Sequence, residues 1–162
     1  MQPELDQLAI RQYVAETFAY TSVVIPEEGI PAGDTFFIYD PAGDLAPTEQ
    51  LPFATIVTKD YGDFDCASHL DRPGVFRLNI GASPDTVRRL FGPPAAAAQA
   101  ADIDFAALDR LLPHPTYAPQ GWLCVLNPSP ATFERLKPLL AEAYARAVER
   151  LSRRRRTATE SR

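Results

Sequence analysis

The chain has 162 residues, of which 46% are apolar and 10% aromatic, so it suits a single domain with its own core and argues against disorder. Its net charge of −5 disfavours general binding to nucleic acid, and no apolar run approaches the ~20 residues that a membrane span needs. The 16 prolines are spread along the chain and predict many turns and firm element ends.

The first 60 residues are predicted to form one helix and three short strands. Apolar residues recur at helical spacing from Glu4 to Phe18, which predicts an amphipathic helix. Runs of β-branched and aromatic residues at 21–25, 35–40 and 53–60 predict strands, and Pro41 ends the second of them.

The next part of the chain is predicted to place a strand directly before a helix. The strand covers residues 76–82, and Ser83 caps a helix whose first residue is Pro84. The alanine-rich residues 93–104 are predicted to form a loop with marginal helix. Residues 105–112 are predicted to form a short helix.

A strand at residues 121–127 leads into the last helix, which runs from Pro130 to about Leu151. We expect a kink, or two abutting helices, at Pro138. This element order predicts an α+β fold, with a mostly antiparallel sheet, helices packed on one face and a long C-terminal helix. Residues 1–152 would form the single domain, and residues 153–162 a basic, disordered tail.

Charge is distributed unevenly along the chain. Residues 1–80 carry 13 acidic and 4 basic residues, whereas the second half is net positive and includes the run Arg153–Arg156. Cys66 and Cys124 form no CxxC pair, and the N-terminus lacks the basic and apolar regions of a signal peptide. We therefore expect a cytoplasmic protein, with no membrane partner and no cofactor.

Several segments resemble an uncharacterised bacterial family, mainly actinobacterial, known as domain of unknown function 6194. They are DTFFIYD, PFATIVTKD, LDRPGVFRLNIG and LLPHPTYAPQGWLCVLNPSPATFERLKPLLAEAY. The order of the later segments is also similar, more distantly, to the MmcQ/YjbR-like fold. That likeness implies an α+β sheet backed by helices and DNA binding through exposed sheet and loop surface. The acidic first half of this chain departs from that expectation.

The alternation in residues 76–80 places Arg77 and Asn79 on the sheet face opposite the helices, which we expect to be open. If the segment with His114, Tyr117 and Trp122 lies beside this strand, the five side chains form a polar and aromatic cleft. An apolar wall with a few placed polar groups is typical of a ligand pocket. His114 could serve in acid–base chemistry, although a turn or lining role is the alternative.

The long connection before residue 76 contains two further candidate groups. Asp71 and Arg72 could present a fixed guanidinium to a carboxylate or phosphate, or could simply hold the loop. An acidic group could bind a hard cation, but its spacing matches no known metal motif, so a solvated loop is favoured and no metal site is predicted. This group comprises Asp60, Asp63, Asp65, His69 and Asp71.

No catalytic signature occurs in the sequence, so we favour binding over catalysis. The expected partner is an unknown small molecule or protein bound on the open sheet face, with a homodimer as a further alternative. A second hypothesis is a DNA-associated protein that uses the sheet face, or the last helix and Arg153–Arg156. A third is a small hydrolase-like enzyme that uses His114 with Asp71 and Arg72.

Overall fold

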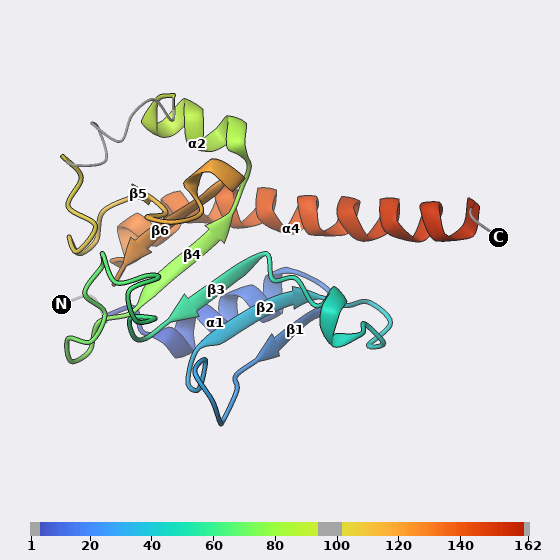
Figure 1. The fold of residues 1–162 in the computed structure, drawn as a ribbon, viewed down its shortest axis with the longest axis horizontal. Helices are drawn as coiled ribbons and strands as arrows, with labels where there is room; N and C mark the ends of the chain where they lie inside the picture. The colour runs from blue at the N-terminus through green and yellow to red at the C-terminus, as the bar shows by residue number, and fades with distance from the viewer. Residues whose placement is uncertain (1–3, 94–101, 161–162) are drawn as a thin grey trace.

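The computed structural model of the chain describes residues 4–93 and 102–160, and it has the α+β fold that the sequence predicts. Six strands form one sheet in the order β1-β2-β3-β4-β6-β5, and each neighbouring pair is antiparallel (Figure 1). The strands are β1 (Thr21–Val24), β2 (Thr35–Tyr39), β3 (Ala54–Val57), β4 (Arg77–Gly81), β5 (Leu112–Pro113) and β6 (Trp122–Leu126). The helices are α1 (Gln7–Thr17), α2 (Pro84–Phe91) and α4 (Pro130–Glu160), with the 3₁₀ turns η1 (Pro47–Glu49) and η2 (Ala118–Gln120).

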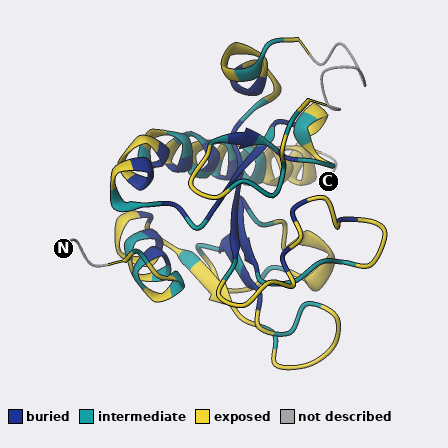
Figure 2. Ribbon diagram, turned by 90° about the vertical axis from the view of Figure 1, so that its left-hand side faces the viewer, coloured by how far each residue is buried: buried dark blue, intermediate teal, exposed yellow. Residues whose placement is uncertain are grey.

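One face of the sheet packs against α1 and α4 and forms the main core. Apolar residues alternate along the central strands, so every second side chain reaches these helices. Burial of each large side chain contributes roughly 1.5–3 kcal/mol, which makes this layer the principal source of stability. The layer includes Ile10 and Val14 of α1, Phe133, Leu136 and Leu140 of α4, and Ile56, Leu78, Ile80, Leu123 and Val125 of the sheet. Figure 2 shows the buried strands lying between the helices and the loops on the other side.

The opposite sheet face is covered by loops, and our expectation of an open face is wrong. Arg77 is 1% exposed and Asn79 is 3% exposed. The connection before β4 folds back over this face, where Leu70 packs against Val57 and Leu126. The segment that carries His114 lies against the same face, and His114 is 4% exposed there beside Arg77. Polar strand residues are buried here because the loops supply their hydrogen-bonding partners.

The short helix expected at residues 105–112 is absent from the structure of that segment. Leu112 and Pro113 form β5, which pairs with Cys124 and Leu123 of β6. β5 lies at the edge of the sheet, where a proline needs no ladder partner for its missing N–H. Sheet pairing therefore overrides the local helix propensity. The alanine-rich segment lies mostly outside the described residues.

α4 is a single helix that continues through Pro138 to Glu160. The two abutting helices considered at Pro138 do not form, because the carbonyl that loses its donor belongs to Glu134 on the exposed side of the helix. Residues 153–160, expected in a disordered tail, continue the same helix beyond the edge of the sheet (Figure 1). The fold thus carries a long basic extension of its last helix.

Candidate functional site

A buried polar cluster lies on the loop-covered face of the sheet, and we call it the Arg77 cluster. It comprises Thr55, Asp65, Ser68, Arg77, Asn79 and His114. Arg77 Nη1 and Nη2 donate to the two carboxylate oxygens of Asp65 at 3.1 and 2.5 Å. Arg77 Nη1 also donates to Ser68 Oγ at 2.8 Å, and Nε donates to Asn79 Oδ1 at 2.8 Å. The guanidinium charge is therefore neutralised inside the protein by a bidentate ion pair.

His114 completes this cluster. The strand that carries Arg77 and the segment that carries His114 are far apart in the sequence but close together in the structure, as predicted. β4 pairs with β6, and His114 Nε2 lies 3.3 Å from Arg77 Nη2. His114 Nδ1 accepts the backbone N–H groups of Thr116 and Tyr117 at 3.0 and 2.9 Å. From these bonds we infer that the neutral ring carries its proton on Nε2. The contact with Arg77 then joins two donors and is not a hydrogen bond.

Burial of His114, followed by the positive charge of Arg77, lowers the pKa of this imidazole to about 3, although Asp65 opposes the shift. The ring is therefore neutral at physiological pH and 4% exposed. Cys124, which lies beside Asn79 in the sheet, has its thiol pKa raised to about 12 by burial. Both groups are buried, so burial keeps the imidazole from gaining a proton and the thiol from losing one.

The Asp71 and Arg72 pair holds the loop that covers the sheet. Arg72 donates to the backbone carbonyls of Ser68, His69 and Ala106 at 3.1, 2.8 and 3.0 Å. Asp71 accepts the backbone N–H of Asp60 at 3.2 Å. No hydrogen bond or ion pair joins either residue to His114 within residues 4–93 and 102–160. The described contacts of Asp71 and Arg72 therefore hold the loop and give no direct support to the hydrolase-like hypothesis.

The acidic loop residues have separate structural partners. Asp60 Oδ1 accepts the Leu70 N–H at 2.9 Å, Asp65 binds Arg77, and Asp63 is exposed. His69 adopts a left-handed conformation with φ of 51°. Within the described part of the chain, no group of three or more His, Cys, Asp or Glu side chains is arranged to hold a metal ion.

A second buried network, centred on Asp34, was missed by the sequence analysis. Asp34 Oδ1 accepts the N–H and hydroxyl of Thr58 at 2.9 and 2.8 Å, and it lies 3.3 Å from Lys59 Nζ. The Tyr61 hydroxyl donates to Asp34 Oδ2, and burial together with this bond raises the pKa of Tyr61. In sequence, Asp34 follows Gly33 and shows only a turn signal.

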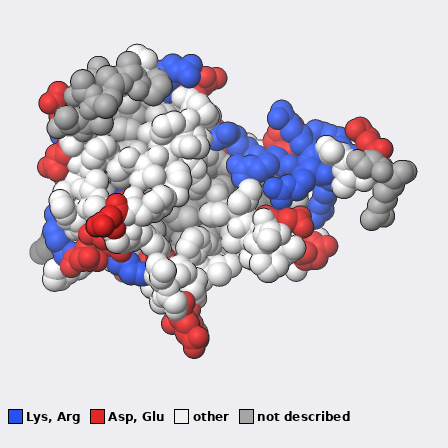
Figure 3. Space-filling model, in the orientation of Figure 1, with Lys and Arg blue, Asp and Glu red and all other residues white. Residues whose placement is uncertain are grey.

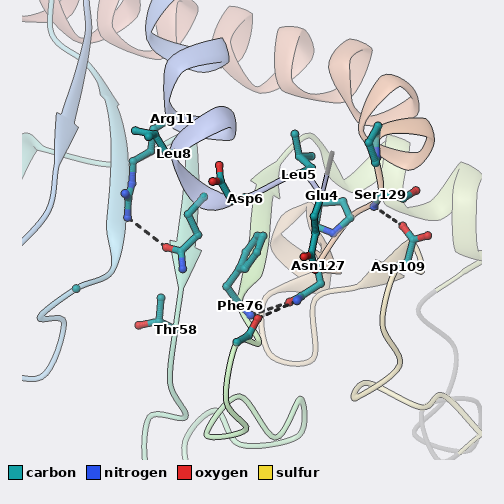
Figure 4. A pocket seen from close by; sticks show the side chains of 15 residues that line it. Glu4, Leu5, Asp6, Leu8, Arg11, Thr58, Phe76, Asp109, Asn127 and Ser129 are labelled. Carbon is teal, nitrogen blue, oxygen red and sulfur yellow. Dashed lines mark hydrogen bonds between the residues drawn. The ribbon is translucent and has the colours of Figure 1, made fainter. Parts of the chain in front are cut away.

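An open groove of about 980 Å³ lies where α1 and α4 begin (Figure 4). Three of its polar side chains are engaged in holding the chain. Asp6 caps α1, Asp109 accepts the Ser129 N–H at 2.7 Å, and Asn127 accepts the Phe76 N–H at 2.8 Å. The groove is large, but these groups already have partners and offer little to a ligand. Its walls also include Glu4, Leu5, Leu8, Arg11 and Thr58.

A smaller cleft of about 260 Å³ opens where β4 ends and β6 begins, and we call it the Trp122 cleft. Gly81 pairs with Trp122, and a Cβ at Gly81 would lie 3.0 Å from two indole carbons. The absence of a side chain at Gly81 therefore lets the indole lie against β4. The cleft is lined by Leu51, Pro52, Phe53, Gly81, Gln120, Trp122, Arg146 and Arg150.

Two arginines of α4 form the basic wall of the Trp122 cleft. Arg146 donates to the backbone carbonyls of Gly81 and Ala82 at the end of β4. Arg150 is half-buried and has no hydrogen bond or ion pair with any described residue. Burial, and then the charges of Arg146 and Arg154, lower the pKa of Arg150. An unpaired, partly desolvated guanidinium beside an aromatic wall is a place where an anion would be stabilised.

The sequence analysis missed Arg146 and Arg150. Their signal is the four-residue spacing of Arg146, Arg150 and Arg154, which places the three on one side of the last helix.

Of the predicted cleft residues, Arg77, Asn79 and His114 lie together in the buried cluster. Tyr117 is 40% exposed and stacks near His114, with ring centroids 5.1 Å apart. Trp122 lies at the end of the sheet, in the separate Trp122 cleft.

Comparison with known proteins identifies the family but adds no activity. No curated protein and no solved structure matches the chain, so the distant likeness to the MmcQ/YjbR-like fold stays an expectation. Of the helices within the described ranges, none is both long enough and apolar enough to cross a membrane. The model of a family of unknown function, DUF6194, matches residues 5–156. The chain therefore belongs to the DUF6194 family.

Proposed function

We propose that this protein binds a small anionic molecule with a planar or apolar part, and that the Trp122 cleft is the binding site. The observation that carries the proposal is Arg150, which the fold partly removes from water and which forms no ion pair with any of the residues that the structure describes. Arg146 and Arg154 add positive charge on the same side of α4. An anion placed against Arg150 would remove this mutual repulsion and would form charge-assisted hydrogen bonds.

The walls of the cleft indicate the second part of the ligand. Trp122 provides an indole surface, and Leu51 and Pro52 provide apolar contacts. The volume of about 260 Å³ is slightly below the roughly 300–1,000 Å³ of most small-molecule pockets, so the cleft suits a single ring and an attached anionic group. Arg146 is held by two backbone carbonyls, which preorganises this wall before a ligand arrives.

The Arg77 cluster is the weaker candidate because its charges already neutralise one another. Arg77 donates to Asp65, Ser68 and Asn79, and all of these residues are buried. An anion would have to displace a bidentate carboxylate and open two loops to reach Arg77. The same cluster can instead hold the sheet and its covering loops in position, which makes it a structural element of the fold.

Trp122 is the only tryptophan in the chain, so its fluorescence reports directly on the cleft. Titration with adenosine monophosphate, which joins a planar base to a phosphate, should quench this fluorescence to saturation. Arg150→Gln should weaken the apparent affinity by about 10-fold or more, since a charge-assisted hydrogen bond contributes roughly 1.5–3 kcal/mol. Arg135→Gln, which removes an exposed charge from the same helix, is the matched control and should leave the affinity unchanged.

Inorganic phosphate provides the second arm of this experiment. It should compete with adenosine monophosphate but bind more weakly, because it makes no contact with the indole. The proposal fails if neither probe changes the fluorescence, or if Arg150→Gln and Arg135→Gln respond to adenosine monophosphate alike.

A further inference from the structure

We infer that the Trp122 cleft belongs to a longer binding surface for single-stranded nucleic acid. One base would occupy the cleft, and the phosphate backbone would follow the second half of α4. This inference rests on the proposed function, because it takes the anion site at Arg150 as the start of the path. It goes further by assigning the class of ligand and by including the helical extension.

The second half of α4 carries a concentrated positive charge. Residues 146–156 contain six arginines and one acid, Glu149, which gives a local net charge of +5 in a chain of net charge −5. Figure 3 shows these basic side chains gathered on the extension of the helix, with acidic side chains beside its base and near its end as well as elsewhere on this face. The overall charge therefore does not describe the potential at this end of the molecule.

The arginine side chains of the extension are exposed and weakly paired. Arg154 lies 3.9 Å from Glu49, and Arg155 lies 3.7 Å from Asp44. Arg153, the most exposed of the group, pairs with Glu149 on its own helix. Exposed pairs of this kind contribute little to stability, so phosphate groups can replace the carboxylates at little cost.

The cleft and the extension are joined by shared walls. Arg150 and Leu51 line the Trp122 cleft, and both also line a smaller cavity that Arg154 and Glu49 border. Arg146, Arg150 and Arg154 follow one another at four-residue steps, each about 6 Å along the helix axis. A row of guanidinium groups thus leads from the indole to the projecting end of α4, as a strand of linked phosphates requires.

Two features favour a single strand over other polyanionic surfaces. Residues 152–160, SRRRRTATE, contain no large apolar side chain, whereas a helix that lies on a membrane needs an apolar face. The Trp122 indole lines a recess, and only an unpaired base can enter it. Bases of a duplex remain stacked inside the double helix, while those of a single strand are free to stack on aromatic side chains.

The test uses the full chain and a fluorescein-labelled oligothymidylate of about 12 nucleotides, within the roughly 4–16-nucleotide range of single-strand sites. Fluorescence anisotropy should show binding that weakens as salt increases. Replacement of Arg154, Arg155 and Arg156 by Gln should weaken binding at low salt by about 10-fold or more. It should also reduce the salt-dependence slope by about 2, at roughly 0.7 for each lost phosphate contact. The matched control replaces the exposed Arg89, Arg110 and Arg135 by Gln and should retain the affinity and the slope.

The outcomes separate this inference from the proposed function. If adenosine monophosphate quenches Trp122 in an Arg150-dependent manner, but the two triple variants bind oligothymidylate alike, the extension has no role and the inference fails alone. The inference also fails if a duplex of the same length binds as tightly as the single strand. Binding to vesicles of phosphatidylcholine and phosphatidylserine without binding to the oligonucleotide would identify a membrane surface instead. If adenosine monophosphate gives no response either, both proposals fail.

Discussion

Asp65→Asn should be one of the most destabilising conservative substitutions in this protein. Asp65 contacts Arg77 with both carboxylate oxygens, at 3.1 and 2.5 Å, and the two side chains are 8% and 1% exposed. The substitution keeps the size of the side chain but leaves the guanidinium charge among neutral partners, chiefly Ser68 and Asn79. Loss of one partner of a buried ion pair costs about 3–5 kcal/mol. In a chain of this length, this corresponds to a decrease in Tm of roughly 6–20 °C.

Urea unfolding at neutral pH, followed by circular dichroism, measures this loss. Glu134→Gln is the control, because it removes an ion pair with Lys137 of similar length, 2.6 Å, that is largely exposed. Its cost should stay below about 1 kcal/mol. The double variant Asp65→Asn/Arg77→Met removes the uncompensated charge and should be less destabilised than Asp65→Asn alone. A loss of less than about 1 kcal/mol for Asp65→Asn would refute the structural role of the cluster.

Two further predictions concern His114 and Arg150. The pKa of His114 is about 3 in the folded protein and about 6.5 when unfolded, so the unfolded chain binds the proton more readily. The contribution of neutral His114 to stability is complete above about pH 6.5 and decreases toward pH 3, by on the order of 2 kcal/mol at pH 5. His114→Gln should lose this part of the pH dependence in urea unfolding, and identical pH profiles for the two proteins would contradict the assignment. Arg150→Gln should raise the free energy of unfolding by about 0.4–1 kcal/mol, because it removes like-charge pairs with Arg146 and Arg154. Arg135→Gln should change the same quantity by less than about 0.5 kcal/mol, and a loss of stability in Arg150→Gln would show that the charge is compensated.

The central strands were predictable because their signals are local, whereas the order of the strands in the sheet was not predicted. Residues 76–80 alternate apolar and polar side chains, residues 122–126 form a continuous apolar run, and Ser83 and Pro84 mark the start of the helix that follows β4. The same local reasoning failed at β5. Leu112 and Pro113 belong to a segment with a plausible helix cap, but pairing with β6 stabilises the extended form instead. Such pairing depends on residues far away in the sequence.

Burial of Arg77 and Asn79 could not be read from the strand pattern. A polar side chain at every second position usually marks a solvent-facing side. Here the loop before β4 supplies Asp65 and Ser68, which satisfy the guanidinium and make its burial tolerable. These partners lie in irregular structure, where sequence spacing carries no periodic signal. The prediction therefore found the correct neighbours but misjudged their access to solvent.

The proposed site was only half visible in the sequence. Trp122 was a candidate because it is the single tryptophan at the entrance of a strand. Arg146 and Arg150 belong to an amphipathic helix, where basic residues on the polar side are common. Their approach to Trp122 depends on where α4 crosses the sheet, as the hydrogen bonds from Arg146 to the end of β4 show. That crossing is a property of tertiary packing.

The two arginine environments show why residue type alone does not locate a binding site. Arg77 is more deeply buried than Arg150, but its carboxylate and hydrogen-bonding partners come from the same chain. An external anion would gain little there, because it would replace interactions that the folded protein already has. At Arg150, folding removes part of the water around the charge, and no residue within 4–93 and 102–160 forms an ion pair with it. Folding has therefore already removed part of the water around the Arg150 guanidinium that a ligand would otherwise have to displace. This is why we propose the Trp122 cleft as the anion site, since no described residue forms an ion pair with its Arg150 guanidinium.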